Sequence, residues 1–89
     1  PAGPYLDAYL VSETGPEEAL RVASRLRQAG VSVDFDPDGR SVKAQFRAAR
    51  RLDAPVILVW KGEGTVDVLA GDERLEMPIE EVPDWLARS

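Results

Sequence analysis

Two short apolar stretches constrain the fold of this chain more than any other feature. Residues 55–60 form an unbroken apolar run, and residues 5–11 are largely apolar and rich in residues that favour strands. Each stretch is typical of a β-strand that is buried on both of its faces. We predict a single domain over residues 5–89, preceded by a linker at residues 1–4, where two prolines and a glycine disfavour regular structure. Such a linker favours an origin in a longer chain.

The segments around these two strands predict an α/β fold. Residues 16–29 carry an apolar stripe at helical spacing between Pro16 and Gly30, which suit a helix start and a helix end. Residues 31–35 alternate apolar and polar side chains, as a strand at a sheet edge does. Two right-handed crossovers make the first three strands parallel, and two tight turns later in the chain add a meander. The other expected elements are a helix at 42–52, strands at 65–69 and 73–77, and a helix at 79–88.

The chain contains no cysteine and no histidine. These absences exclude disulfides, thiolate catalysis and Ser-His-Asp chemistry, and they remove the commonest ligand of transition metals. We therefore predict no catalytic residue, no metal site and no cofactor. No run of 18 apolar residues and no secretory signal are found, which favours a cytoplasmic protein without a membrane partner.

Basic residues are concentrated in one segment of an otherwise acidic chain. Residues 40–51 contain five basic residues and no acid, whereas the remainder has six basic residues against sixteen acids. A helix in this segment has two different sides, because successive side chains are 100° apart. The apolar side, which is expected to be buried, consists of Val42, Phe46, Ala49 and Leu52. The basic side consists of Lys43, Arg47, Arg50 and Arg51.

The basic side of this helix has two interpretations. It is either a solvated face whose charge is neutralised by acids on neighbouring elements, or a surface that contacts a polyanion, as clustered Lys and Arg side chains do in phosphate binding. The net charge of −5 argues against a general nucleic-acid binder and against a DNA partner. A local contact remains compatible with it, because exposed charges are screened beyond about 8–10 Å at physiological salt.

Residues 29–55, AGVSVDFDPDGRSVKAQFRAARRLDAP, resemble the carboxy-terminal anticodon-binding domain of class II aminoacyl-tRNA synthetases. The resemblance is closest to the histidyl-tRNA synthetase branch. It depends on the apolar strand after Ala29-Gly30 and on a turn and helix start of the type Gly-Arg-Ser-x-Lys-x-Gln. Three positions differ from the family pattern, with Ala44 for a second lysine, Arg50 for Asp or Asn, and Asp53 for glycine. The matching residues are Gly39, Arg40, Ser41, Lys43, Gln45, Ala49, Ala54 and Pro55.

The resemblance implies a fold and a function. The fold would be a three-layer α/β/α domain with a mixed five-stranded sheet of order 2-1-3-4-5, in which strand four is antiparallel. The domain would bind the anticodon stem-loop of a tRNA and would be non-catalytic by itself. A separate upstream domain, or a homodimer partner, would supply the rest of a tRNA ligase. The expected RNA-binding residues are Arg40, Ser41, Lys43, Arg47, Arg50 and Arg51.

Other interpretations remain open at this point. A non-catalytic derivative of the same fold, used for protein–protein contact or regulation, agrees with the acidic balance, and a small-molecule or metal-binding α/β domain is a third alternative. Asp34, Asp36 and Asp38 reproduce the first half of a calcium loop, although Gln45 stands where a bidentate glutamate is needed. The same stretch is also explained as a turn with a helix-capping Asp38 or Ser41. Trp60 is either a core residue or a surface on which a base stacks.

Overall fold

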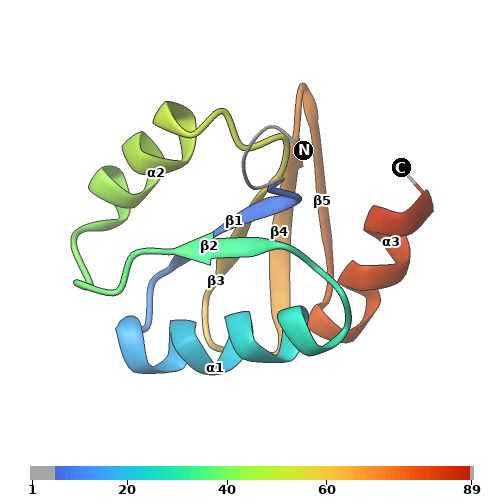
Figure 1. Cartoon of the computed structure of the whole chain (residues 1–89), viewed down its shortest axis with the longest axis horizontal. Coiled ribbons are helices and arrows are strands. Elements are labelled where there is room, and N and C mark those ends of the chain that lie inside the picture. Colours follow the sequence, from blue (N-terminus) through green and yellow to red (C-terminus); the bar gives the residue numbers. More distant parts are fainter. Residues whose placement is uncertain (1–5, 89) are drawn as a thin grey trace.

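The computed structural model describes residues 6–88. The predicted linker at residues 1–4 lies outside the described residues. The order of elements agrees with the order predicted from the sequence. The elements are β1 (Ala8–Ser12), α1 (Pro16–Gln28), β2 (Val33–Phe35), α2 (Val42–Arg51), β3 (Ile57–Trp60), β4 (Thr65–Ala70), β5 (Glu73–Pro78), a 3-10 turn η1 (Ile79–Glu81) and α3 (Val82–Arg88) (Figure 1).

The five strands form one mixed sheet in the order β2-β1-β3-β4-β5. β1 runs parallel to both β2 and β3, with Leu10 opposite Phe35 on one side and Leu58 on the other. β4 is antiparallel to β3 and to β5. The predicted α/β fold class, sheet order and antiparallel fourth strand are therefore confirmed.

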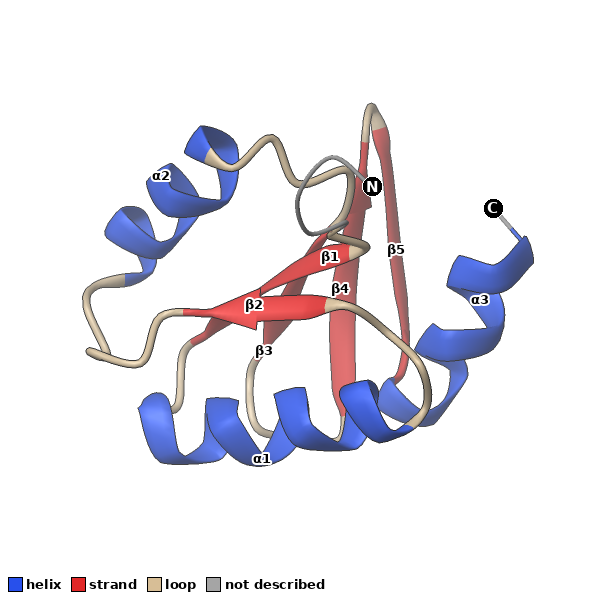
Figure 2. Cartoon of the chain, viewed as in Figure 1, coloured by secondary structure: helices blue, strands red, loops and turns tan. Residues whose placement is uncertain are grey.

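Helices cover both faces of the sheet, because alternate strand residues point to opposite sides (Figure 2). On one face, Leu10 and Leu58 belong to a core cluster that also contains Leu26 of α1 and Val82 of α3. On the other face, a smaller cluster joins the strands to α2. It consists of Tyr9, Val11, Ala48, Ala49 and Val59. No helix within residues 6–88 is long and apolar enough to span a bilayer.

The apolar side of α2 differs from the prediction at its end. Ala49 is fully buried and Val42 and Phe46 are partly buried, but the side chain of Leu52 is 51% exposed. Leu52 is the C-cap of α2, and it lines a surface pocket. The prediction for Leu52 is wrong because helical spacing says which side a residue is on, but not whether a neighbouring element covers it.

Candidate nucleic-acid interface

Two polar residues fix the start of α2. The Ser41 side chain caps the helix, since its Oγ accepts a hydrogen bond from the N–H of Ala44 at 3.2 Å. Gln45 is 5% exposed and is bonded to the end of β1. Its Oε1 accepts from the N–H of Ser12 at 2.8 Å, and its Nε2 donates to the carbonyl of Ser12 at 3.0 Å and to that of Arg40 at 2.8 Å. Helix α2 is thereby attached to the sheet by side-chain hydrogen bonds as well as by packing.

The basic side of α2 is turned outward. We call Lys43, Arg47, Arg50 and Arg51 the cationic face; all four are exposed. Arg50 lies over the Phe46 ring, with 5.7 Å between its guanidinium carbon and the ring centre. Within residues 6–88, none of the four forms an ion pair. Six other cations are each paired with a carboxylate: Arg21, Arg25, Arg27, Arg40, Lys61 and Arg74. Charge neutralisation by neighbouring acids is therefore not the arrangement found among the described residues.

Arg40 differs from the cationic face, because it is already bonded to an acid. Asp36 is 4% exposed, and its Oδ2 accepts from Nε of Arg40 at 2.7 Å and from the Arg40 N–H at 3.3 Å. Its Oδ1 accepts from the N–H of Asp38 at 2.9 Å. Burial raises the pKa of Asp36, but the hydrogen bonds from Arg40 and Asp38 and the charge of Arg40 outweigh it, so this pKa lies below its ordinary value. The pair holds the loop between β2 and α2 in one shape.

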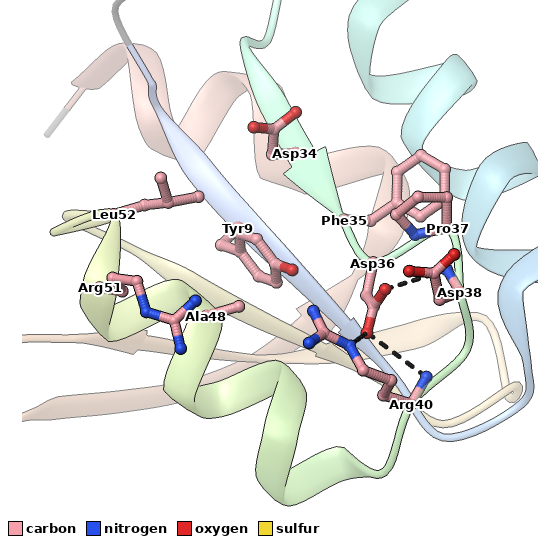
Figure 3. Close-up of a pocket in the computed structure, with 10 residues that line it drawn as sticks. All are labelled: Tyr9, Asp34, Phe35, Asp36, Pro37, Asp38, Arg40, Ala48, Arg51 and Leu52. Carbon is pink, nitrogen blue, oxygen red and sulfur yellow. Dashed lines mark hydrogen bonds and ion pairs between the residues drawn. The ribbon is translucent and has the colours of Figure 1, made fainter.

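A pocket of about 470 Å³ lies between β2, the loop that follows it, and α2 (Figure 3). Tyr9 lies in the middle of the group, Arg40 and Asp36 on one side, and Arg51 and Leu52 on the other. The pocket brings Arg40 and Arg51, two predicted site residues, to one cavity. The sequence offered no signal for Tyr9, which reads as a strand residue like its neighbours.

The structure answers two of the questions that the sequence leaves open, the calcium loop and the role of Trp60. The calcium-loop interpretation is wrong, because Asp36 is occupied by Arg40 and by backbone N–H groups, and Gln45 is occupied by Ser12 and Arg40. No group of three acids in the described part of the chain is arranged to hold a metal ion. Trp60 is a core residue, 7% exposed, and its indole N–H donates to Oε1 of Glu18 at 2.8 Å.

Comparison with known proteins identifies relatives of this domain. A family model described as "Anticodon binding domain" matches residues 8–89. Histidine–tRNA ligase of Geobacillus kaustophilus is 35% identical over an alignment of 89 positions. The alignment covers 91% of this chain and 21% of the relative. Histidine–tRNA ligase of Anaeromyxobacter sp. (strain K) is 41% identical over 63 residues, covering 71% of this chain and 14% of the relative. The chain thus spans about a fifth of the length of such relatives, or less.

Two solved structures share the fold. Apo histidyl-tRNA synthetase of S. aureus superposes with a TM-score of 0.75 and 22% identity, covering 91% of this chain and 23% of that one. The RNA binding domain of threonyl-tRNA synthetase from Cryptosporidium parvum superposes with a TM-score of 0.79 and 16% identity, covering 93% and 23%. Since the family model extends over nearly all of the sequence, this chain belongs to the anticodon-binding domain family.

Proposed function

We propose that this domain binds the anticodon stem-loop of a tRNA, with the cationic face of α2 against the RNA backbone. One observation carries the proposal. A chain of net charge −5 pairs six of its cations with carboxylates. Four others, Lys43, Arg47, Arg50 and Arg51, lie together on α2, are exposed and form no ion pair with any residue from 6 to 88. Unpaired cations on one helix face are available to phosphates without first breaking an internal ion pair.

The start of α2 would contribute polar contacts beside these charges. The Ser41 oxygen already accepts from Ala44, but its hydroxyl hydrogen remains available to a phosphate oxygen. Arg40 would contribute only its terminal nitrogens, because its Nε is bonded to Asp36. The four residues of the cationic face would neutralise about four phosphates, so log K should change with log salt concentration with a slope of about −3 for single-stranded RNA.

The relatives suggest the protein to which this function belongs. They are named as histidine–tRNA ligases and are about five or more times longer than the matched region. We propose that aminoacylation resides in a separate domain upstream of this one. This domain would hold the tRNA together with that upstream domain or with a second copy of the protein. The complex would form in the cytoplasm. Neither DNA nor a membrane is expected as a partner.

A charge-matched pair of variants tests RNA binding. Lys43→Gln combined with Arg47→Gln removes two charges from the cationic face, whereas Arg21→Gln combined with Arg25→Gln removes two charges from α1, where both residues are paired with acids. Affinity for an anticodon stem-loop is measured by fluorescence anisotropy from 20 to 300 mM salt. The α2 variant should bind more weakly, with a salt slope smaller in magnitude by about 1.4, and the α1 variant should bind like the parent.

Two outcomes would contradict the proposal. Equal weakening in both variants would mean that binding follows net charge and not the cationic face. No binding of the stem-loop by the parent domain at low salt would favour the alternative function, a non-catalytic derivative that contacts another protein. That alternative is supported by the net charge of −5 and by Ala44, which stands where the family pattern has a second lysine.

A further inference from the structure

We propose that β5 pairs antiparallel with β5 of a second copy of this chain, across a two-fold axis at Leu75. The two five-stranded sheets would then form one continuous sheet. This inference goes beyond RNA binding and uses none of the residues of the cationic face. It depends on the open edge of the sheet, on the backbone groups of β5 that face this edge, and on the charges beside them.

The two edges of the sheet differ in how well they are protected (Figure 2). The edge strand β2 has only three residues, and the carbonyl of Val33 accepts from Nε and a terminal nitrogen of Arg27 at 3.1 and 2.7 Å. The edge strand β5 has six residues. It pairs with β4 without a bulge, and its single proline is its last residue. Short strands, bulges and prolines are the usual protection against pairing, so β2 is protected and β5 is open.

The turn between β4 and β5 determines which backbone groups of β5 face the open edge. Ala70 and Glu73 lie opposite each other across a two-residue turn, and Gly71 has the positive φ, 61°, that a type II′ turn requires. The pair that flanks such a turn is hydrogen-bonded, and bonded and non-bonded pairs alternate from there. The N–H and C=O groups of Arg74 and Glu76 therefore point away from β4, toward the open edge.

The side chains of Arg74 and Glu76 carry opposite charges on one face of the sheet. Arg74 donates to Oδ2 of Asp67 at 3.0 Å, yet its side chain is still 70% exposed. Glu76 lies directly opposite Asp67 and forms no ion pair with any residue from 6 to 88. Like charges opposite each other destabilise a sheet. Glu76 therefore lacks a cation of its own, and Arg74 of a second copy would supply one.

These charges select one register for the pairing of two β5 strands. With the axis at Leu75, Arg74 of each copy lies opposite Glu76 of the other, and each such pair exchanges both of its N–H···O bonds. A slip of two residues places Arg74 opposite Arg74 in one direction and Glu76 opposite Glu76 in the other, which like charge disfavours. A slip of one residue places outward-facing backbone groups opposite groups that already face β4. The strand is thus complementary to itself in a single arrangement.

Leu75 adds an apolar contact on the other face of the sheet. Its side chain is partly buried and packs against the core cluster that contains Val82 of α3. At the axis it would meet Leu75 of the second copy in a non-hydrogen-bonded pair, in which side chains approach most closely. Because α3 packs on this face of the sheet, it does not take the place of a neighbouring strand. An interface of one strand is small, so the dimer should be weak.

Sedimentation velocity of the whole chain, from about 10 µM to about 1 mM, tests for this weak dimer. Arg74→Glu and Glu76→Arg each place like charges in both pairs, so each should weaken dimerisation by about tenfold or more. An equimolar mixture of these two variants restores opposite charges in both pairs and should dimerise about as well as the parent. Arg21→Glu is the control, since Arg21 is also 70% exposed and paired with an acid, but lies on α1. Circular dichroism confirms that the variants are folded.

Three outcomes would overturn the inference. The parent could be monomeric at every concentration, Arg21→Glu could weaken the dimer as much as Arg74→Glu, or the mixture could associate no better than either variant alone. Amide exchange in the parent places the contact independently of any variant. Exchange at Arg74 and Glu76 should slow as the concentration rises, and slowing at β2 or α2 instead would also overturn the inference. RNA binding is measured separately and stands or falls without this dimer.

Discussion

Gln45 of α2 forms hydrogen bonds with both backbone groups of Ser12 at the end of β1, at 2.8 Å from the N–H and 3.0 Å to the carbonyl. The amide thus forms the two hydrogen bonds that a neighbouring strand would otherwise form with Ser12. Without Gln45, the buried N–H and carbonyl of Ser12 would have no partner. The same amide bonds the carbonyl of Arg40, so one side chain joins the sheet, the loop and the helix that carries the cationic face.

Replacement of Gln45 should destabilise the domain. Gln45→Ala leaves the buried N–H and carbonyl of Ser12 without partners, and we expect a loss of about 2–4 kcal/mol in the free energy of unfolding. Gln28→Ala, at the exposed end of α1, is the control and should change stability by less than about 0.5 kcal/mol. Urea unfolding followed by circular dichroism measures both. A loss for Gln45→Ala no larger than that of the control would show that water satisfies Ser12 equally well.

Replacement of Asp53 by glycine should stabilise the domain. Both α1 and α2 end in the same motif, in which a backbone N–H just after the helix donates to a carbonyl of the last turn. The N–H of Val31 donates to the carbonyl of Leu26, and the N–H of Ala54 donates to that of Ala49. The left-handed residue is Gly30 in α1, with φ of 91°, and Asp53 in α2, with φ of 56°. Asp53→Gly should raise the free energy of unfolding by about 0.5–1 kcal/mol, since glycine adopts this conformation without steric cost.

Gly30→Ala is the reverse experiment. A Cβ at Gly30 would meet no atom within 4 Å, so the substitution isolates the backbone conformation and should cost about 1–2 kcal/mol. Thermal unfolding by calorimetry measures both changes. Destabilisation by Asp53→Gly would mean that the aspartate side chain contributes more than its backbone conformation costs.

Gly39→Ala should be more costly than Gly30→Ala. Gly39 lies in the loop before α2 with φ of 66°, and a Cβ there would approach Cδ of the Pro16 ring at 2.9 Å. The alanine therefore adds crowding against a rigid ring to the left-handed backbone, and we expect a total loss of about 2–4 kcal/mol. Urea unfolding of the two alanine variants compares them directly. Equal losses would show that the loop moves away from α1 at little cost.

The Asp36–Arg40 pair should make stability depend on pH in the acidic range. The pKa of Asp36 is lowered in the folded protein, so its contribution is complete above the ordinary pKa of 3.8 and is lost as the pH falls through the lower folded value. Arg40→Gln removes the partner, which should raise the pKa of Asp36. The variant should therefore be less stable than the parent at neutral pH, and this difference should shrink at low pH.

Carbon-detected NMR of the Asp36 carboxyl group measures this pKa in the parent and in the variant. Arg74→Gln is the control, since Arg74 is paired with Asp67 at 3.0 Å and not with Asp36. The Asp36 titration should be unchanged in the control. An Asp36 pKa that is the same with and without Arg40 would mean that the backbone N–H bonds alone lower it.

Much of this fold follows from local patterns in the sequence. The unbroken run before Trp60 and the alternation that ends at Phe35 distinguish a central strand from an edge strand, and both assignments are confirmed. The resemblance around Gly39 and Gln45 supplied the sheet order. The sequence also predicts the cationic face, because the spacing of side chains around a helix does not depend on the segments that surround it.

Other features were decided only by the tertiary structure. The bond between Ser12 and Gln45 joins residues 33 positions apart, the pocket brings Tyr9 to Arg40, and Leu52 is exposed although its spacing places it on the buried side. Periodicity is a property of one segment, and the sequence therefore determined the elements and their faces. Partners, cavities and coverage depend on where separate segments meet in space, which is set by the packing of the whole sheet and its helices.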